Sequence, residues 1–230
     1  MASLGFEEAR HRIGTLSFAT LLAWAGGFLD GFTYIGHGHV FANAMTGNVV
    51  LLGIDCLSGS WRTAFRHLPA IAAFLVGVSV AHAVELRYKI RGWSAPYVGV
   101  LALEIGILLV LSLLPQAAAD IWFTAGIAFA AAVQVETFRE VNGHSFNSTF
   151  ITGNLRQMCA AAVDWFFQGH SQAAARKMRD FSAICLAFLV GATTGGYGAQ
   201  AFGNRALWCD AILLILIAIR VQFRLNAGTE

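Results

Sequence analysis

Apolar stretches of bilayer-spanning length recur along the whole chain. A hydrocarbon core about 30 Å thick needs roughly 20 apolar residues of helix, and stretches of this kind occupy 15–35, 68–86, 95–114, 121–135, 181–201 and 206–219. Hydrophobic residues make up 57% of the chain and charged residues only 12%, which is far from a soluble domain. We therefore expect an all-α integral membrane protein with six transmembrane helices in a single membrane domain.

A short polar motif occurs twice within this apolar sequence. Thr46-Gly47-Asn48 returns as Thr152-Gly153-Asn154, 106 residues later, and Phe74-Leu75-Val76-Gly77 returns as Phe188-Leu189-Val190-Gly191, 114 residues later. These offsets predict two internal repeats, about 13–114 and 119–222, with the extra residues in a longer second linker, since insertions favour linkers. Internal repeats are typical of transporters, whose pathway lies between the halves.

Two further apolar segments, 40–54 and 146–167, contain the motifs and decide the topology. If all eight segments cross, Lys and Arg divide nine to five between the two sides; if the motif segments re-enter, the division is eleven to three. The positive-inside rule favours the second arrangement, with a cytoplasmic N-terminus. Three crossings per half is an odd number, so the two repeats are expected to be inverted, with two re-entrant or broken helical segments.

The motif residues are the candidate substrate site. In inverted repeats the two motifs face each other near mid-depth, where non-helical backbone is tolerated only beside protein or water. Glycine permits a break, and threonine and asparagine cap helix ends or bind a polar solute. A helix N-terminus there also attracts an anion. Close helix packing is the alternative. The substrate-binding candidates are Thr46, Gly47, Asn48, Thr152, Gly153, Asn154 and Arg156.

Ionisable residues inside or beside the spans are the candidates for ion coupling. Asp30 and Glu136 correspond at the 106-residue offset, although contact with headgroup water is an alternative role for both. Glu104 interrupts an apolar span and needs a partner, for which Arg156 and His82 are candidates. The histidines form a proton relay, a metal site or merely polar turns. The ion-coupling candidates are Asp30, Glu136, His37, His39, His144 and Glu104.

Other features narrow the function further. Gly27-x-x-x-Gly31 and Gly191-x-x-x-Gly195 let helices approach closely, in the bundle or at a homodimer seam. The four cysteines lie singly, so a metal site built on them is not expected. A net charge of +2 does not indicate nucleic-acid binding. We find no catalytic motif and expect no enzyme activity and no cofactor.

The first motif segment carries a family resemblance. The stretch from Asp30 to Gly53, DGFTYIGHGHVFANAMTGNVVLLG, resembles the signature of the YoaK-like family of bacterial multi-pass membrane proteins, a family of unknown function. The second Thr-Gly-Asn and the chain length agree with it. The resemblance implies a location in the bacterial cytoplasmic (inner) membrane and implies no reaction.

The sequence therefore predicts a transporter or channel for a small polar solute or ion, in contact with the lipid bilayer. Two other classes stay open. A structural or regulatory membrane subunit would not need the polar motif residues for flux, and an intramembrane metal-dependent enzyme would assemble His37, His39 and a carboxylate around a metal. A six-span protein with two re-entrant segments is also similar in outline to the aquaporins, which use a different motif, so this analogy is weak.

Overall fold

The computed structural model describes residues 13–91, 96–142, 144–167 and 169–227. The predicted N-terminal orientation rests on a count of Lys and Arg that includes Arg10 and Arg12, and these two residues lie outside the described part, as does Ala95. Within it the chain forms α2 (Leu16–Gly36), α3 (Met45–Leu57), α4 (Trp61–Ala64), α5 (Leu68–Arg91), α6 (Tyr97–Ser112), α7 (Asp120–Thr137), β1 (Glu140–Val141), β2 (His144–Ser145), α8 (Ile151–Phe167), α9 (Gln172–Phe202), the 3-10 turn η1 (Gly203–Ala206) and α10 (Leu207–Asn226).

The long helices coincide with the apolar segments of the sequence. Each of the six predicted spans lies within or largely overlaps one helix among α2, α5, α6, α7, α9 and α10. Several ends have local causes: Pro96 precedes α6, and Pro69 occupies the first turn of α5, where its missing N–H costs nothing. Among the described residues, two stretches satisfy both the length and the apolarity that a bilayer crossing needs, Trp61–Arg91 and Gln172–Asn226. The all-helical fold is confirmed, and the number of crossings stays a prediction.

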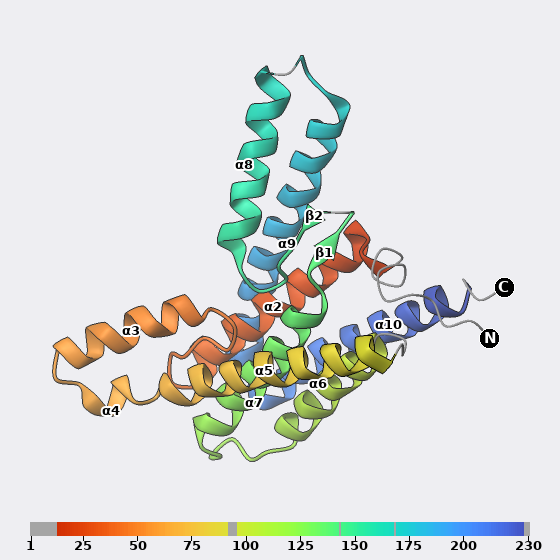
Figure 1. The fold of residues 1–230 in the computed structure, drawn as a ribbon. Coiled ribbons are helices and arrows are strands. Elements are labelled where there is room, and N and C mark those ends of the chain that lie inside the picture. Colours follow the sequence, from red (N-terminus) through yellow and green to blue (C-terminus); the bar gives the residue numbers. More distant parts are fainter. Residues whose placement is uncertain (1–12, 92–95, 143, 168, 228–230) are drawn as a thin grey trace.

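The long helices of the first half pack against those of the second half. Helix α2 lies along α9, α5 lies along α7, and α6 packs against α10 (Figure 1). The hairpin of α8 and the first part of α9 extends away from this body, and α3 extends from it in another direction. The first helix of each half thus contacts the third helix of the other half, and the fourth helices contact each other.

Glycine makes the α2–α9 contact possible. A Cβ on Gly27 would lie 2.1 Å from the carbonyl oxygen of Phe188, and one on Gly191 would lie 2.0 Å from that of Trp24. Gly31 and Gly195 are equally close to the opposite backbone. The two small-residue motifs therefore join these helices within the bundle, so the homodimer seam is not needed to explain them.

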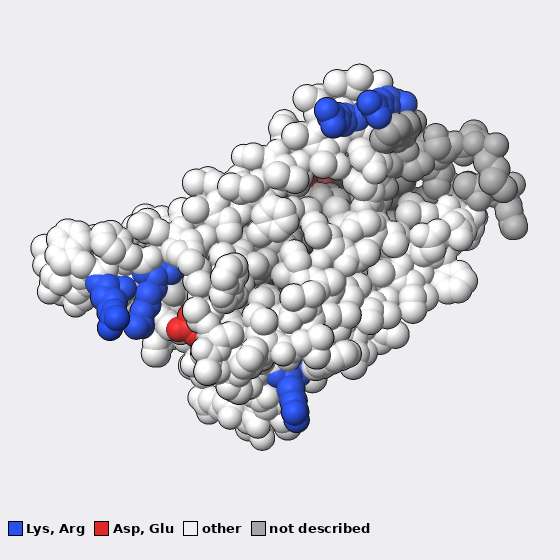
Figure 2. All heavy atoms as spheres, turned by 90° about the horizontal axis from the view of Figure 1, so that it is seen from below, with Lys and Arg blue, Asp and Glu red and all other residues white. Residues whose placement is uncertain are grey.

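Apolar side chains also cover much of the surface. Leu75 and Val76 of α5 are 62% and 54% exposed, and their counterparts Leu189 and Val190 of α9 are 61% and 52% exposed. The face in Figure 2 carries its Lys and Arg side chains near its margins and is almost uncharged between them. An exposed apolar surface of this extent fits lipid better than water.

The two predicted repeats differ in length at another place than the sequence suggested. Helix α8 has 17 residues against 13 in α3, and α9 has 31 against 24 in α5. The insertion lengthens both arms of a helical hairpin, so the expectation of a longer linker was wrong. The short strands β1 and β2, which pair antiparallel between α7 and α8, were not foreseen either.

Candidate functional site

Both Thr-Gly-Asn motifs lie in the first turn of a helix. Helix α3 begins at Met45 and α8 at Ile151, so each motif follows the helix start by one residue. Both helices continue through Gly47 and Gly153, and neither glycine has a positive φ. The expected helix break at the motif was therefore wrong; the irregular backbone comes just before it.

The side chains of Asn48 and Asn154 form hydrogen bonds with the irregular backbone that precedes each helix. The Nδ2 of Asn48 donates to the carbonyl oxygen of Phe41 at 2.7 Å, and the Oδ1 accepts from the Phe41 N–H at 3.0 Å. The Nδ2 of Asn154 donates to the carbonyl oxygen of Asn147 at 2.7 Å, again seven residues earlier. Both asparagines are buried. This geometry favours the helix-start role over direct contact with a solute.

Asp30 caps the beginning of α3 from a different helix. Its Oδ1 accepts from the N–H groups of Asn43 at 2.7 Å and Ala44 at 3.4 Å, and the Asn43 side chain donates to the Gly26 carbonyl oxygen at 2.8 Å. A carboxylate is favoured at a helix N-terminus because the N–H groups there lack partners and the helix dipole is positive. Asp30 thereby ties α2 to α3.

A groove of about 330 Å³ connects the two motifs. We call it the inter-motif groove; its walls include Asp30 and Tyr34 of α2, Thr46 of α3, Thr149 and Thr152 at the start of α8, and Phe188 of α9. Thr46 and Thr152 are both exposed, in contrast to the buried asparagines. Each motif thus turns its threonine to the groove and its asparagine to the protein.

The two helix starts beside the groove differ in charge. The start of α3 faces the carboxylate of Asp30, whereas α8 is capped by a neutral amide, since Asn147 Oδ1 accepts from the N–H groups of Thr149 and Phe150, both at 2.9 Å. A neutral cap leaves the positive end of the α8 dipole uncompensated. The groove therefore offers an acidic wall and a weakly positive wall, together with two hydroxyl groups.

Glu136 lies near the C-terminal end of α7, in an ionic cluster that is separate from the inter-motif groove. It contacts Arg139 and His82, and Arg139 also pairs with Glu85 at 2.9 Å. Glu85 pairs in turn with Lys89 at 2.8 Å. Donor atoms of His82, Glu85 and Glu136 lie within 4.8 Å of one another, but Arg139 and Lys89 already compensate the carboxylates. Glu136 does not share the role of Asp30, despite the matching offset.

The candidate histidines do not come together as a relay. His37 is buried against Phe123, with ring centroids 3.9 Å apart, and its Nδ1 lies 3.1 Å from Asp120 Oδ1. Burial lowers the pKa of His37, and Asp120 partly opposes this shift. His39 is exposed in a left-handed turn beside Tyr34, and His144 is exposed in β2. Among the described residues, no hydrogen bond joins these three histidines and the metal-capable cluster is His82, Glu85 and Glu136, so the structure lends no support to the relay or to the His37–His39 metal site, and the polar-turn alternative fits His39.

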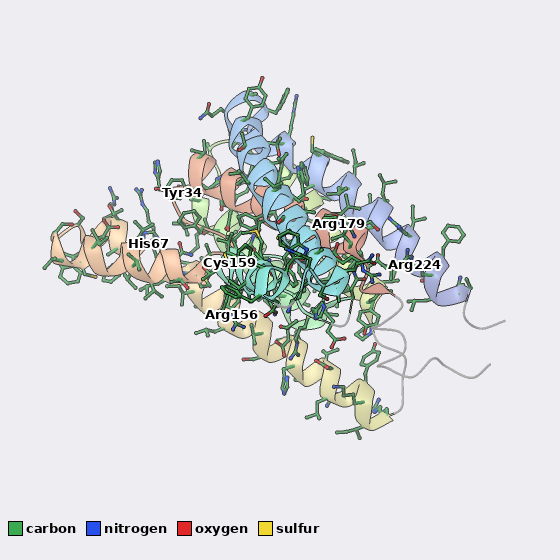
Figure 3. All side chains as sticks on the ribbon, turned by 90° about the horizontal axis from the view of Figure 1, so that it is seen from above. Tyr34, His67, Arg156, Cys159, Arg179 and Arg224 are labelled. Carbon is green, nitrogen blue, oxygen red and sulfur yellow. The ribbon has the colours of Figure 1, made fainter. Side chains whose placement is uncertain are left out.

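Arg156 and Glu104 also differ from expectation. Arg156 is exposed on α8, one turn before Cys159 (Figure 3), and the structure shows no ion pair from it to Glu136 or Asp30 within the described residues. Glu104 is buried, and its Oε2 accepts from Gln134 Nε2 at 2.7 Å. The partner of Glu104 is neither of the two expected residues. Arg156 is exposed, and His82 pairs with Glu136.

Among the buried polar residues that sequence reasoning missed are His67 and Asp210. The Nδ1 of His67 lies 3.3 Å from Asn48 Oδ1 and its Nε2 lies 3.5 Å from Asp55 Oδ2, so His67 supports the first motif from the α4–α5 connection (labelled in Figure 3). Asp210 is completely buried on α10.

Comparisons with known proteins agree with this description. Residues 18–220 match the family described as "Protein of unknown function (DUF1275)". The chain belongs to this DUF1275 family. It is 25% identical over 211 residues to the "UPF0700 transmembrane protein YoaK" of Bacillus subtilis (strain 168), covering 90% of this chain and 94% of that protein. No solved structure matches the chain.

Family membership confirms the resemblance seen in the sequence and supports a membrane protein. The matched region includes both motifs, nearly all of α2, most of α10 and every described helix between them. A DUF1275 assignment carries no reaction or substrate, so the function has to be argued from the groove.

Proposed function

We propose that the protein carries a small polar solute or ion across the bacterial inner membrane, as a transporter or channel, through the inter-motif groove. One observation carries this proposal: threonines from two motifs that are 106 residues apart line a single groove, together with Asp30. A duplicated polar element around one groove is typical of transport proteins built from repeats. No catalytic step is part of the proposal.

The architecture that we propose has six crossings and two inverted halves, with the N-terminus in the cytoplasm. Reciprocal packing supports it, because α2 on α9 and α5 on α7 are the pairs that a two-fold operation would exchange. A two-fold axis in the membrane plane relates inverted repeats and passes close to the substrate site. In this arrangement the exposed leucines and valines of α5 and α9 face lipid.

The chemistry of the groove suggests how a solute is held. Thr46 and Thr152 offer hydroxyl groups that both donate and accept hydrogen bonds. The uncompensated start of α8 favours an electron-rich group of the solute, and Asp30 favours a donor or a cation. A small solute with both kinds of group, or an ion with part of its hydration shell, fits these walls.

Cysteine labelling tests whether water reaches the groove. In a background with Cys56, Cys159, Cys185 and Cys209 replaced by Ala, the Thr46→Cys and Thr152→Cys variants should react with a charged, membrane-impermeant methanethiosulfonate. A pathway requires reaction when the reagent is added on either side of the membrane. The matched controls Leu75→Cys and Leu189→Cys, on the apolar surface, should not react.

Each outcome decides between functions. Reaction of both threonine positions from both sides supports a transport pathway. Reaction from one side alone indicates a receptor-like pocket without a pathway and overturns transport. Threonine positions as unreactive as Leu189→Cys mean a dry groove, which favours a structural or regulatory subunit.

A further inference from the structure

Two buried carboxylates lie on the helices α6 and α10, which pack together. Glu104 and Asp210 are 106 residues apart, like the two motifs. The same offset relates Leu101 to Leu207 and Leu108 to Leu214, and all six side chains are buried. The two carboxylates thus lie on α6 and α10, the fourth helices of the two halves, which pack together.

These carboxylates are deeply buried and poorly satisfied. Glu104 is 1% exposed and Asp210 is 0% exposed. Gln134 donates to Glu104 Oε2, but among the described residues Glu104 Oε1 and both Asp210 oxygens have no hydrogen-bond partner. The helices that carry them, α6 and α10, pack against each other, so the two buried carboxyl groups repel each other when both are charged. Buried oxygens without hydrogen-bond partners lower the free energy of unfolding. Their presence therefore calls for an explanation other than stability.

No positive group balances the pair within the described structure. Glu104 faces the neutral Gln134 of α7 and interacts with no described basic side chain. Arg220 and Arg224 of α10 begin ten residues beyond Asp210, roughly 15 Å along the helix. The other charged or titratable side chains on the elements packed here are Asp30, Tyr34, Tyr97, Asp120, Glu136, Arg205 and Cys209.

Two carboxylates in this setting cannot both be ionised. Like charges that share an apolar site repel, and one of them keeps a proton. A hard metal cation is a poorer occupant, because it takes six or more oxygen ligands. Gln134 presents its N–H to Glu104 and its Oε1 already accepts from Ser148 at 2.9 Å. The donor set therefore suits a proton.

We propose that Glu104 and Asp210 together hold one exchangeable proton inside the membrane and form the ion-coupling site of this protein. Binding converts a carboxylate into a carboxylic acid, and release restores the carboxylate, with no other bond changed. Asp210 is new to the list of coupling candidates, and Glu104 is the one sequence candidate that keeps this role.

A hydrogen-bonded path links the pair to the inter-motif groove. Gln134 donates to Glu104 and accepts from the Ser148 hydroxyl, and the next residue, Thr149, lines the groove. Loss of the proton at Glu104 strengthens the bond from Gln134, because a charged acceptor binds its donor more tightly. The position of the Ser148–Thr149 backbone then depends on proton occupancy. This coupling rests on the proposed function, whereas proton binding does not.

Infrared difference spectroscopy of the whole protein in lipid tests proton binding. A protonated carboxylic acid has its own carbonyl stretching band. We expect this band at neutral pH in the unmodified protein and a decrease in its intensity in the Glu104→Gln, Asp210→Asn double variant. Both amides resemble the protonated acid in shape and charge, so the variant should fold. Asp164→Asn, an exposed carboxylate on α8, is the control and should keep the band.

Other outcomes overturn the proposal. A band that is absent at neutral pH, or that is undiminished in the double variant, means that the pair holds no proton. A band that disappears on addition of sodium ions at constant pH means that the site takes a cation. None of these results depends on whether the groove is wet, so the labelling experiment can fail independently.

The coupling has a separate readout. With Thr152→Cys, the ratio of labelling rates from the two sides should change with pH, and the ratio cancels the pH dependence of the thiol itself. Adding Glu104→Gln and Asp210→Asn should remove this change. A ratio that is constant with pH in the protein with an intact pair would show that the proton is bound but not coupled to the groove.

Discussion

At the scale of single residues, one motif serves two purposes. The asparagine of each Thr-Gly-Asn is buried and holds the chain seven residues earlier, whereas the threonine is exposed at the groove. A segment of irregular backbone must satisfy its N–H and C=O groups, and the asparagine amide does this for the residue at that distance. The motif is therefore a means of presenting a hydroxyl on a fixed helix start.

The two asparagines should differ in their contribution to stability. Asn48 binds both backbone groups of Phe41 and also contacts His67, whereas Asn154 donates one bond to Asn147. Asn48→Ala leaves more buried groups unsatisfied, each worth about 1–3 kcal/mol, and should lower the free energy of unfolding more than Asn154→Ala. Unfolding in mixed micelles measures the difference, with the exposed Thr46→Ala as a nearly neutral control. An equal loss in both variants would contradict this reading.

The sequence identified some of these residues and missed others for physical reasons. Thr46, Thr152 and Asp30 were found because they are polar residues at repeated positions in apolar sequence, and the structure brings them to one groove. The proposed relay of His37, His39 and His144 finds no support in the structure, because residue type says nothing about which connections fold toward each other. His67 lies in a polar connection, where a histidine is unremarkable until α5 buries it against Asn48.

At the scale of helices, close approach at glycine determines the pairing. The carbonyl oxygens of Trp24 and Phe28 on α2 occupy the space where Gly191 and Gly195 lack a side chain. Similarly, Gly77 of α5 lies against the Phe129 carbonyl and Ala132 of α7. Since lipid tails are as apolar as leucine, such backbone contacts and not hydrophobic burial hold membrane helices together.

Replacement by alanine should affect stability differently at Gly191, which touches another helix, and at Gly153, which does not. In Gly191→Ala the new Cβ would be 2.0 Å from the Trp24 carbonyl oxygen, so α2 and α9 must move apart, at a cost of about 1–3 kcal/mol or more. In Gly153→Ala the new Cβ meets nothing within 4 Å, and alanine favours helix by up to about 1 kcal/mol. Thermal stability in detergent should fall in the first variant and hold or rise in the second. A stable Gly191→Ala would refute the close α2–α9 contact.

The helices themselves were largely predictable, and their packing was not. The apolar segments marked the six long helices to within a few residues at most ends, because hydrocarbon thickness and helix rise set their length. Asp210 falls near the start of an apolar segment, where it resembles a residue at the membrane surface. Only the contact between α6 and α10 shows that it is buried beside Glu104.

At the scale of the whole molecule, the reciprocal contacts make the two halves dependent on each other. Neither α2 nor α5 finds its principal partner within its own half, since these partners are α9 and α7. The groove and the carboxylate pair likewise take residues from both halves. Function and stability are therefore properties of the complete pair of repeats.

The inverted arrangement predicts the sidedness of two corresponding connections. Ser58 follows α3 and Ser171 precedes α9, and inversion places these positions on opposite sides of the membrane. In the cysteine-free background, an impermeant reagent should label Ser58→Cys from the periplasmic side and Ser171→Cys from the cytoplasmic side. Labelling of both variants from the same side would indicate parallel repeats with four crossings per half.

The exchange of helix partners between the halves also bears on how such a chain arose. An ancestor with the length of one half would have left its first and third helices unpaired, so it needed a second copy of itself. Because the proposed halves are inverted, that copy must have entered the membrane in the opposite orientation. Fusion of two such chains fixes one orientation for each, and only then can the start of α3 recruit Asp30 while that of α8 recruits Asn147.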